Sequence, residues 1–270
     1  MAAFAPATYT VEAFNISHAS ENKIHDDTVA KKLGFTGGLV PGVEVFAYAS
    51  HPAVVTWGRA WLERGTMEAR FLKPVYDGRT AIVSAVPGAA GLELKVESEG
   101  VLCATGQAGL PARAGKAPDL SDYPVHAIPE LAARPPADQA SLAEGQRLCS
   151  RPTALTPDVM AAYLRDIRET APLYAAEGIA HPGLLLRQCN MALRDNVVLP
   201  PWIHTGSKVG NFAMAKTGDT LTVRSRVTAN YERKGHRLVD MDCVVIANGA
   251  RVVARVLHTA VYQLRHLAAA

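Results

Sequence analysis

The sequence predicts an α+β fold built from two copies of one structural plan. Two apolar helical stretches open at Gly42 and Gly183, 141 residues apart. Each is followed by a run of β-formers, and the runs that begin at Thr80 and Thr220 keep an offset of 140 residues. The links between the expected strands are too short for crossovers, which favours antiparallel pairing. We therefore expect a duplicated domain in which several strands follow one buried helix.

In the first half, the apolar run 43–62 is long enough to form the central helix. A loop with a short helical piece, within residues 10–32, precedes it. Glu99-Gly100 is a predicted tight turn between the last two strands. The strands themselves are expected near residues 66–73, 79–86, 92–98 and 101–108.

The second half follows the same order. Residues 158–174 have a helical pattern and occupy the place of residues 10–32, and the central helix opens at Gly183. Asn248-Gly249 is the strongest hairpin indication in the chain, because both residues tolerate positive φ. The expected strands lie near residues 205–213, 220–231, 236–247 and 251–264.

The two halves are joined by a stretch rich in Pro, Ala and Gly, with Pro135-Pro136 near its centre. It is typical of a linker that crosses the surface, with one short helix expected around residues 138–146. We expect an N-terminal domain over residues 1–109, a linker over 110–157 and a C-terminal domain over 158–270.

The composition indicates a soluble globular protein, because 49% of the 270 residues are hydrophobic and 20% are charged. A net charge of +3, without a basic cluster among aromatics, argues against nucleic acid as a partner. The N-terminus lacks the pattern of a secretory signal, and no apolar run reaches the roughly 18 residues of a membrane span. Four scattered cysteines are expected to be reduced thiols in a cytoplasmic protein: Cys103, Cys149, Cys189 and Cys243.

The most informative stretch is residues 20–42, which places His25 just ahead of the first central helix. The neighbours of this histidine are polar: Glu21, Asn22 and the pair Asp26-Asp27. An imidazole titrates near neutral pH and suits general acid–base catalysis, and a helix N-terminus can stabilise an oxyanion. The alternative is a histidine in a polar surface loop without a catalytic role.

Three elements of this stretch resemble the MaoC-like hydratases and dehydratases of the hotdog fold. They are Asn22-Lys23-Ile24-His25, Gly34-Phe35 and Gly42, in the order of that family's motifs. The resemblance implies two fused hotdog domains, in each of which an antiparallel sheet wraps around a central helix. The repeat at constant offset, with a Pro-rich linker between its copies, predicts that the two sheets join edge to edge. Two positions depart from the pattern, because Ser20 stands in place of the family's catalytic aspartate and Pro41 in place of its second histidine.

The resemblance implies a catalytic set of His25, Glu21, Ser20 and Asn22. Glu21, or else Asp26 or Asp27, would take over the proton transfer of the missing aspartate, and Ser20 could still orient a water. The backbone of Gly42 would bind the thioester carbonyl. Further substrate contacts are expected from Val43, Phe35 and His204. For His204 and His181, the alternative is a purely structural role.

The resemblance implies an enzyme that hydrates 2-enoyl-CoA or dehydrates 3-hydroxyacyl-CoA, without a cofactor. A hotdog acyl-CoA thioesterase and a non-catalytic acyl-CoA-binding protein are the alternatives. The expected partners are an acyl-CoA or another acyl thioester, and further copies of the chain in a homodimer or higher homo-oligomer. The second half would be a degenerate copy that completes the cavity. The sequence contains no spaced histidine pair for a metal, no glycine-rich nucleotide motif and no Gly-x-Ser-x-Gly elbow.

Overall fold

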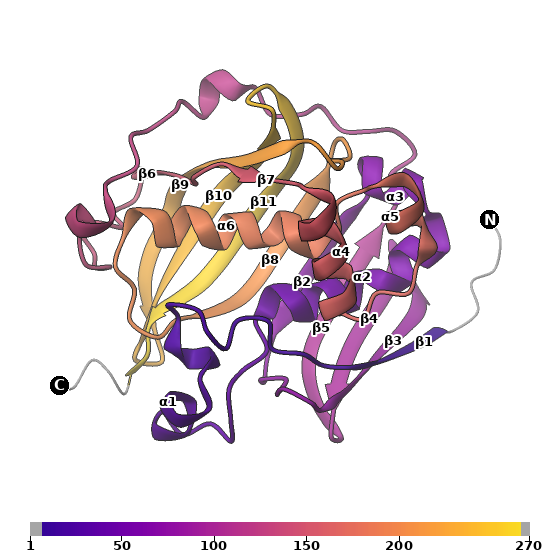
Figure 1. Ribbon diagram of the computed structural model, residues 1–270, viewed down its shortest axis with the longest axis horizontal. Helices are drawn as coiled ribbons and strands as arrows, with labels where there is room; N and C mark the ends of the chain where they lie inside the picture. Colours follow the sequence, from indigo (N-terminus) through magenta and orange to yellow (C-terminus); the bar gives the residue numbers. More distant parts are fainter. Residues whose placement is uncertain (1–6, 266–270) are drawn as a thin grey trace.

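The computed structural model describes residues 7–265 and has one antiparallel sheet of eleven strands with its main helices on one face (Figure 1). The strand order is β1-β3-β4-β5-β2-β8-β11-β10-β9-β6, and β7 pairs with β9. The strands of the first half are β1 (Ala7–Glu12), β2 (Thr66–Phe71), β3 (Thr80–Gly88), β4 (Gly91–Ser98) and β5 (Val101–Gly109). Those of the second are β6 (Arg147–Cys149), β7 (Thr153–Ala154), β8 (Ile203–Asn211), β9 (Thr220–Arg233), β10 (His236–Ala247) and β11 (Arg251–Gln263).

The two halves join where β2 pairs with β8, in register from Thr66 opposite Gly210 to Arg70 opposite Gly206. The pairing is antiparallel, so the predicted edge-to-edge junction is confirmed. Gly206 permits a close approach here, because a Cβ at this position would lie 3.0 Å from the carbonyl oxygen of Ala69.

The duplication is visible in backbone hydrogen bonds that recur after 140 residues. The N–H of Val40 donates to the carbonyl of Val75, and that of Ala180 to the carbonyl of Ala215, both at 2.9 Å. Isolated bridges repeat the offset, because Leu39 pairs with Tyr76 and Ile179 with Lys216. The two chain segments that enter the central helices are therefore held against their sheets in the same way.

Each half has one long helix over its own strands. The helix α2 (Gly42–Trp57) packs on strands β1 to β5 and also on β8 at the junction, and α6 (Pro182–Asn196) packs on β6, β9, β10 and β11 (Figure 1). The two helices also contact each other. The remaining helices are short: η1 (Lys23–His25), α1 (Asp27–Lys32), α3 (Arg59–Arg64), η2 (Leu120–Asp122), η3 (Leu131–Ala133), α4 (Pro157–Asp166) and α5 (Pro172–Glu177).

Two predicted helices are interrupted. The run 43–62 divides into α2 and α3 at Gly58, whose φ of 56° ends the first helix. The run 158–174 divides into α4 and α5, because Arg168 has a φ of 57° and Pro172 starts a new helix. Glycine adopts this backbone conformation without a steric cost, whereas Arg168 does not.

The predicted linker contains more regular structure than expected, because β6 and β7 both pair with β9. The helix predicted around residues 138–146 is wrong. The Asp138 carboxylate accepts hydrogen bonds from the N–H groups of Ala140 and Ser141, which closes a turn instead. Strand β1 was not expected either, although Ala7, Tyr9 and Val11 alternate with polar residues along it.

The crossing of the two long helices is tight at Gly183. A Cβ there would clash with the hydroxyl group of Tyr163 and the methyl group of Ala47, and would lie 3.1 Å from the carbonyl oxygen of Val43. Within residues 7–265, no helix has the length and apolar character needed to cross a membrane.

We expect Gly183→Ala to lower the free energy of unfolding by about 1–3 kcal/mol, because overpacking outweighs the gain in helix propensity. Gly210→Ala is the matched control, since a Cβ at that position meets no atom within 4 Å. Urea unfolding of the two variants provides the measurement. A Gly183→Ala protein as stable as the control would show that the helices are not in close contact at this point.

Candidate active site

His25 is held at the end of η1 by hydrogen bonds on both sides. Its Nδ1 atom lies 2.7 Å from the carbonyl oxygen of Leu39, and its own carbonyl accepts a hydrogen bond from Asn15 at 2.8 Å. A carbonyl oxygen can only accept, so Nδ1 carries the proton. The Nε2 atom of the neutral ring is therefore an acceptor.

The environment keeps this imidazole uncharged. Burial lowers the pKa of His25 to about 4, the hydrogen bond to Leu39 opposes that change, and the positive charge of Arg187 adds to it. At neutral pH the ring is thus a base with a fixed tautomer and orientation.

Asn22 attaches the His25 loop to the second half of the chain. Its amide nitrogen donates to the carbonyl of Trp202 at 2.9 Å, and its amide oxygen accepts from the Trp202 N–H at 3.2 Å. The same amide nitrogen lies 3.3 Å from Nε2 of His25. Asn22 therefore orients the imidazole and docks it on the segment before β8.

Two cavities with shared walls lie beside His25. The smaller, of about 30 Å³, can hold one water molecule. The larger has a volume of about 270 Å³. His25, Asn22, Pro41, Asn190 and Trp202 line both. The smaller is closed by Ile24, Leu39, Val40, Gly42, Ile203 and His204, and the larger by Ser17, Ser20, Glu21, Val43, Arg134, Arg187, Met191, Arg194, Val197, Val198 and Leu199.

The N-terminus of α2 opens onto the smaller cavity at Gly42. Pro41 precedes the helix and makes no side-chain cap, so the first N–H groups of α2 lack a capping side chain. Gly42 cannot be replaced by a larger residue without movement, because a Cβ would lie 2.9 Å from Nδ1 of His204 and 3.1 Å from its carbonyl oxygen. This helix end can therefore donate hydrogen bonds to an oxygen atom of a ligand.

The equivalent end of α6 is occupied by the protein itself. The Nδ1 atom of His181 accepts the N–H of Gly183 at 3.1 Å and so caps the helix. Its Nε2 atom donates to the buried carboxylate of Glu169, which also accepts from His51 at 2.7 Å. Burial alone would raise the pKa of Glu169, but these hydrogen bonds hold it well below its usual range. His181 lines neither cavity, which agrees with a structural role.

His204 lies beneath Gly42 in a chain of buried polar groups. Its Nε2 atom donates to the carbonyl of Gly206 at 3.1 Å and contacts the hydroxyl of Ser207 at 2.8 Å. Ser207 in turn lies 3.0 Å from Nδ1 of His258, whose ring stacks on that of His204. Since Nε2 is the donor, Nδ1 of His204 is an acceptor, and it has no partner within the described residues. Burial lowers the pKa of both rings.

The structure brings most of the predicted site residues together. Ser20, Glu21, Asn22, His25 and Val43 line the larger cavity, and Gly42 and His204 line the smaller. Phe35 is not with them, because it packs against the apolar cluster of Ile24, Ala30 and Leu39 below the loop.

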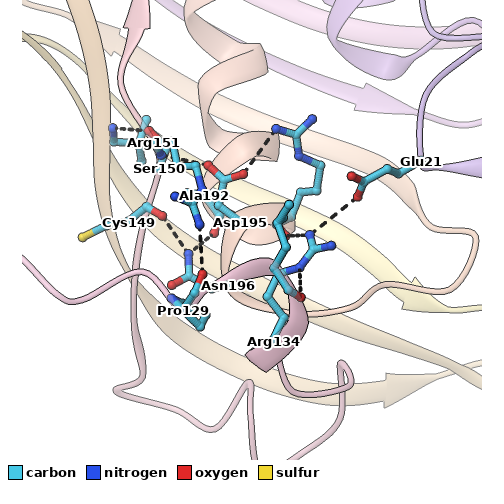
Figure 2. A network of polar contacts seen from close by, with 12 residues as sticks. Glu21, Pro129, Arg134, Cys149, Ser150, Arg151, Ala192, Asp195 and Asn196 are labelled. Atoms are coloured by element: carbon cyan, nitrogen blue, oxygen red, sulfur yellow. Dashed lines mark hydrogen bonds and ion pairs between the residues drawn. The ribbon is translucent and has the colours of Figure 1, made fainter.

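The carboxylates of the loop differ in their surroundings. Asp26 caps α1 by accepting the N–H of Val29, and Asp27 accepts the N–H of Gly38. Both are therefore engaged in shaping the loop. Glu21 is exposed at the edge of the larger cavity, where its carboxylate lies 3.5 Å from the guanidinium of Arg134, near the end of α6 (Figure 2).

Sequence reasoning missed the contribution of α6. Arg187, Asn190, Met191 and Arg194 all face the larger cavity, at the spacing of one helix face. Asn190 is buried, and its side-chain oxygen has no partner in the part of the chain that is described. The central helix of the second half was expected to be buried, so the polar residues on it were the indication in the sequence that it borders a cavity. Among residues 7–265 no three His, Cys, Asp or Glu side chains gather as metal ligands.

Comparison with solved structures shows the double hotdog fold. A conserved hypothetical protein from Mycobacterium tuberculosis with this fold is 16% identical, with 97% of this chain and 96% of that one covered and a TM-score of 0.64. A protein from Chloroflexus aurantiacus J-10-fl, provisionally named a MaoC domain dehydratase, is 12% identical over 98% and 96%, with a TM-score of 0.62. A provisionally named thioesterase II from Thermobifida fusca YX is 15% identical over 95% and 92%, with a TM-score of 0.51.

No family model and no curated protein matches the chain. At identities this low the structural likeness shows the fold, and the double hotdog architecture predicted from the loop motifs is confirmed.

The buried histidines predict a loss of stability in mild acid. The folded-state pKa is about 4 for His25 and about 3 for His258, whereas both titrate near 6.5 in an unfolded chain. As the pH falls below 6.5, the unfolded chain binds protons that the folded protein does not. The free energy of unfolding should then fall by up to about 1.4 kcal/mol per pH unit for each histidine, until its folded-state pKa is reached.

Urea unfolding at pH 7.5, 6.5, 5.5 and 4.5 measures this slope. His258→Gln should remove the contribution of one histidine to this pH dependence, whatever its effect on the free energy of unfolding at pH 7.5. A wild-type stability that stays constant between pH 6.5 and 5 would contradict the expectation.

Proposed function

We propose that this double-hotdog protein is a hydro-lyase that acts on acyl thioesters, by reversible hydration of a 2-enoyl thioester to the 3-hydroxyacyl thioester. One observation carries the proposal. The Nε2 atom of a neutral, oriented His25, whose protein contact is a long hydrogen bond of 3.3 Å from Asn22, borders a cavity for a single water, next to the uncapped N-terminus of α2. A base, a confined water and an oxyanion-stabilising helix end are the groups that this reaction requires.

The thioester carbonyl is assigned to the N-terminus of α2. Addition of water to Cβ moves an electron pair onto the carbonyl oxygen, and the first N–H groups of the helix stabilise the negative charge that develops there. The close contact between Gly42 and His204 fixes the position of this helix end. The acyl chain then occupies the larger cavity, whose apolar wall includes Val43, Met191 and Leu199.

The reacting water is assigned to the smaller cavity. It would donate one hydrogen bond to Nε2 of His25, in place of the 3.3 Å hydrogen bond from Asn22, and the other to the side-chain oxygen of Asn190 or to Nδ1 of His204, which have no partner among the described residues. Buried acceptors of this kind are satisfied by an ordered water. Asn190 thus orients the water, as an aspartate does in the enzymes that the loop resembles, without taking up its proton.

His25 transfers the proton in both steps. As the water oxygen bonds to Cβ, one O–H bond breaks and the proton moves to Nε2, while the Cα–Cβ π-electrons pass to the thioester enolate. The imidazolium then returns the proton to Cα. Burial makes the protonated ring a stronger acid than an exposed histidine, because it lowers the pKa. The reverse sequence eliminates water from the 3-hydroxyacyl thioester.

His25→Gln should lower kcat for hydration of a short enoyl-CoA by roughly 100-fold or more, because the amide cannot transfer a proton. Loss of enoyl absorbance and release of free thiol are followed together. Circular dichroism and urea unfolding verify that the variant is folded.

Hydration changes only the enoyl signal. Release of thiol that depends on His25 would instead indicate a thioesterase, and binding without turnover would indicate an acyl-thioester-binding protein. Since the base form is required, kcat/KM should stay level from pH 9 to 6 and fall only as the pH approaches 4.

Two further variants separate the proton-transfer group from the water-orienting group. Asn190→Ala should lower kcat by about 10- to 100-fold, because the water loses one acceptor. Glu21→Gln should change kcat less than about 3-fold, since its carboxylate is exposed and paired with Arg134. If Glu21→Gln lowered kcat by about 100-fold while Asn190→Ala kept a kcat near that of the wild type, Glu21 would be the group that performs the second proton transfer.

A further inference from the structure

The larger cavity is lined by three arginines and a single carboxylate. We propose that Arg187 binds a carboxylate carried by the acyl chain, so that the preferred substrate is a short acidic acyl thioester. This inference rests on the proposed function for the identity of the reacting group. The cationic side chains are Arg134, Arg187 and Arg194, and the carboxylate is that of Glu21.

Arg187 is fixed by a buried partner on the other central helix. Its Nη1 atom donates to Oε1 of Glu44 at 2.6 Å, and Glu44 is fully buried on α2. The arginine side chain itself remains 24% exposed and lines the cavity. Because a guanidinium has five N–H donors in a planar fork, one bond to Glu44 leaves others for a ligand.

The two neighbouring arginines are also held in place. Arg194 pairs with the buried carboxylate of Asp195 at 3.2 Å, and Arg134 donates to the backbone carbonyl of Arg194 at 2.7 Å. Glu44 and Asp195 do not line the cavity. The counter-charges therefore lie in the protein interior, and the positively charged groups face the ligand space.

A carboxylate fits this arrangement better than a phosphate of the thioester carrier. Arg187 shares the cavity with His25 and is close enough for its charge to lower the imidazole pKa. In an acyl-CoA the phosphates lie at the far end of the neutral pantetheine arm, away from the reacting carbons. A volume of about 270 Å³ also suits a short acyl chain better than a nucleotide.

The apolar residues of the larger cavity restrict which ligands can occupy it. Val43, Met191, Val197, Val198 and Leu199 surround the carbon chain. A neutral chain that filled the cavity would displace solvent from the guanidinium N–H groups that are not bonded to protein carboxylates and would offer them no anionic partner. A chain that ends in a carboxylate satisfies them through bidentate, charge-assisted hydrogen bonds.

The experiment compares two five-carbon 2-enoyl thioesters that differ only at the chain end, one a carboxylate and the other a carboxamide. Both are prepared on N-acetylcysteamine, which carries no phosphate, and also on CoA. We expect wild-type kcat/KM to favour the carboxylate by roughly 10-fold or more on both carriers.

The test variants keep the helix crossing filled. Glu44→Gln/Arg187→Gln replaces the ion pair by two neutral amides and should abolish the preference for the carboxylate, read as the ratio of kcat/KM for the two chain ends. Arg187→Lys keeps the charge without the fork and should retain part of the preference. Arg79→Gln is the control, because Arg79 is exposed and pairs with Glu99 away from both cavities.

Equal rates on the two chain ends, or a preference unchanged in the double variant, would overturn the inference. An effect of the double variant on the CoA thioesters alone would assign Arg187 to the carrier phosphates and would overturn it as well. Calorimetric binding of the two saturated thioesters separates this inference from the proposed function. An Arg187-dependent preference for the carboxylate in binding would support the inference even if no thioester is hydrated.

Discussion

The docking of Asn22 on the backbone of Trp202 is the interaction on which the candidate site depends. A loop imidazole has many orientations, and a base is effective only when its lone pair points at the reacting atom. One amide restricts this loop by bonding to both backbone groups of a residue 180 positions away while it contacts His25. The hydrogen bond from His25 to Leu39 then fixes the tautomer. The site therefore exists only when both halves are folded against each other.

The two copies of the domain differ at the N-terminal ends of their central helices. Both helices enter through the same backbone hydrogen bonds, so the duplication still determines the framework. At α6 the His181 ring caps Gly183, and Glu169 holds that ring. At α2 a proline precedes Gly42 and offers no cap. A helix end whose N–H groups are already satisfied cannot stabilise an oxyanion, so one copy has a candidate site and the other has a packed interior.

The sequence allowed much of the fold to be predicted, because strand alternation, hairpin residues and the constant offset are local properties. The loop residues around His25 were also identifiable from their order. The sequence could not indicate that Asn190 and Arg187 face His25, since that contact depends on how two helices cross. The interruptions at Gly58 and Arg168 and the turn at Asp138 show a second limit. A single residue in a left-handed conformation, or one side chain that accepts two backbone N–H groups, can override a helical pattern.

The face of α6 that carries Arg187, Asn190, Met191 and Arg194 has a consequence for how such a protein can diversify. In a symmetric dimer of identical subunits, any change on this helix face would appear in two places and would alter both ends of the assembly. In a fused chain, this face of α6 belongs to one half and the histidine loop to the other. Substitutions on α6 can then accumulate without disturbing the loop, so that the recognised ligand and the chemistry performed on it evolve separately.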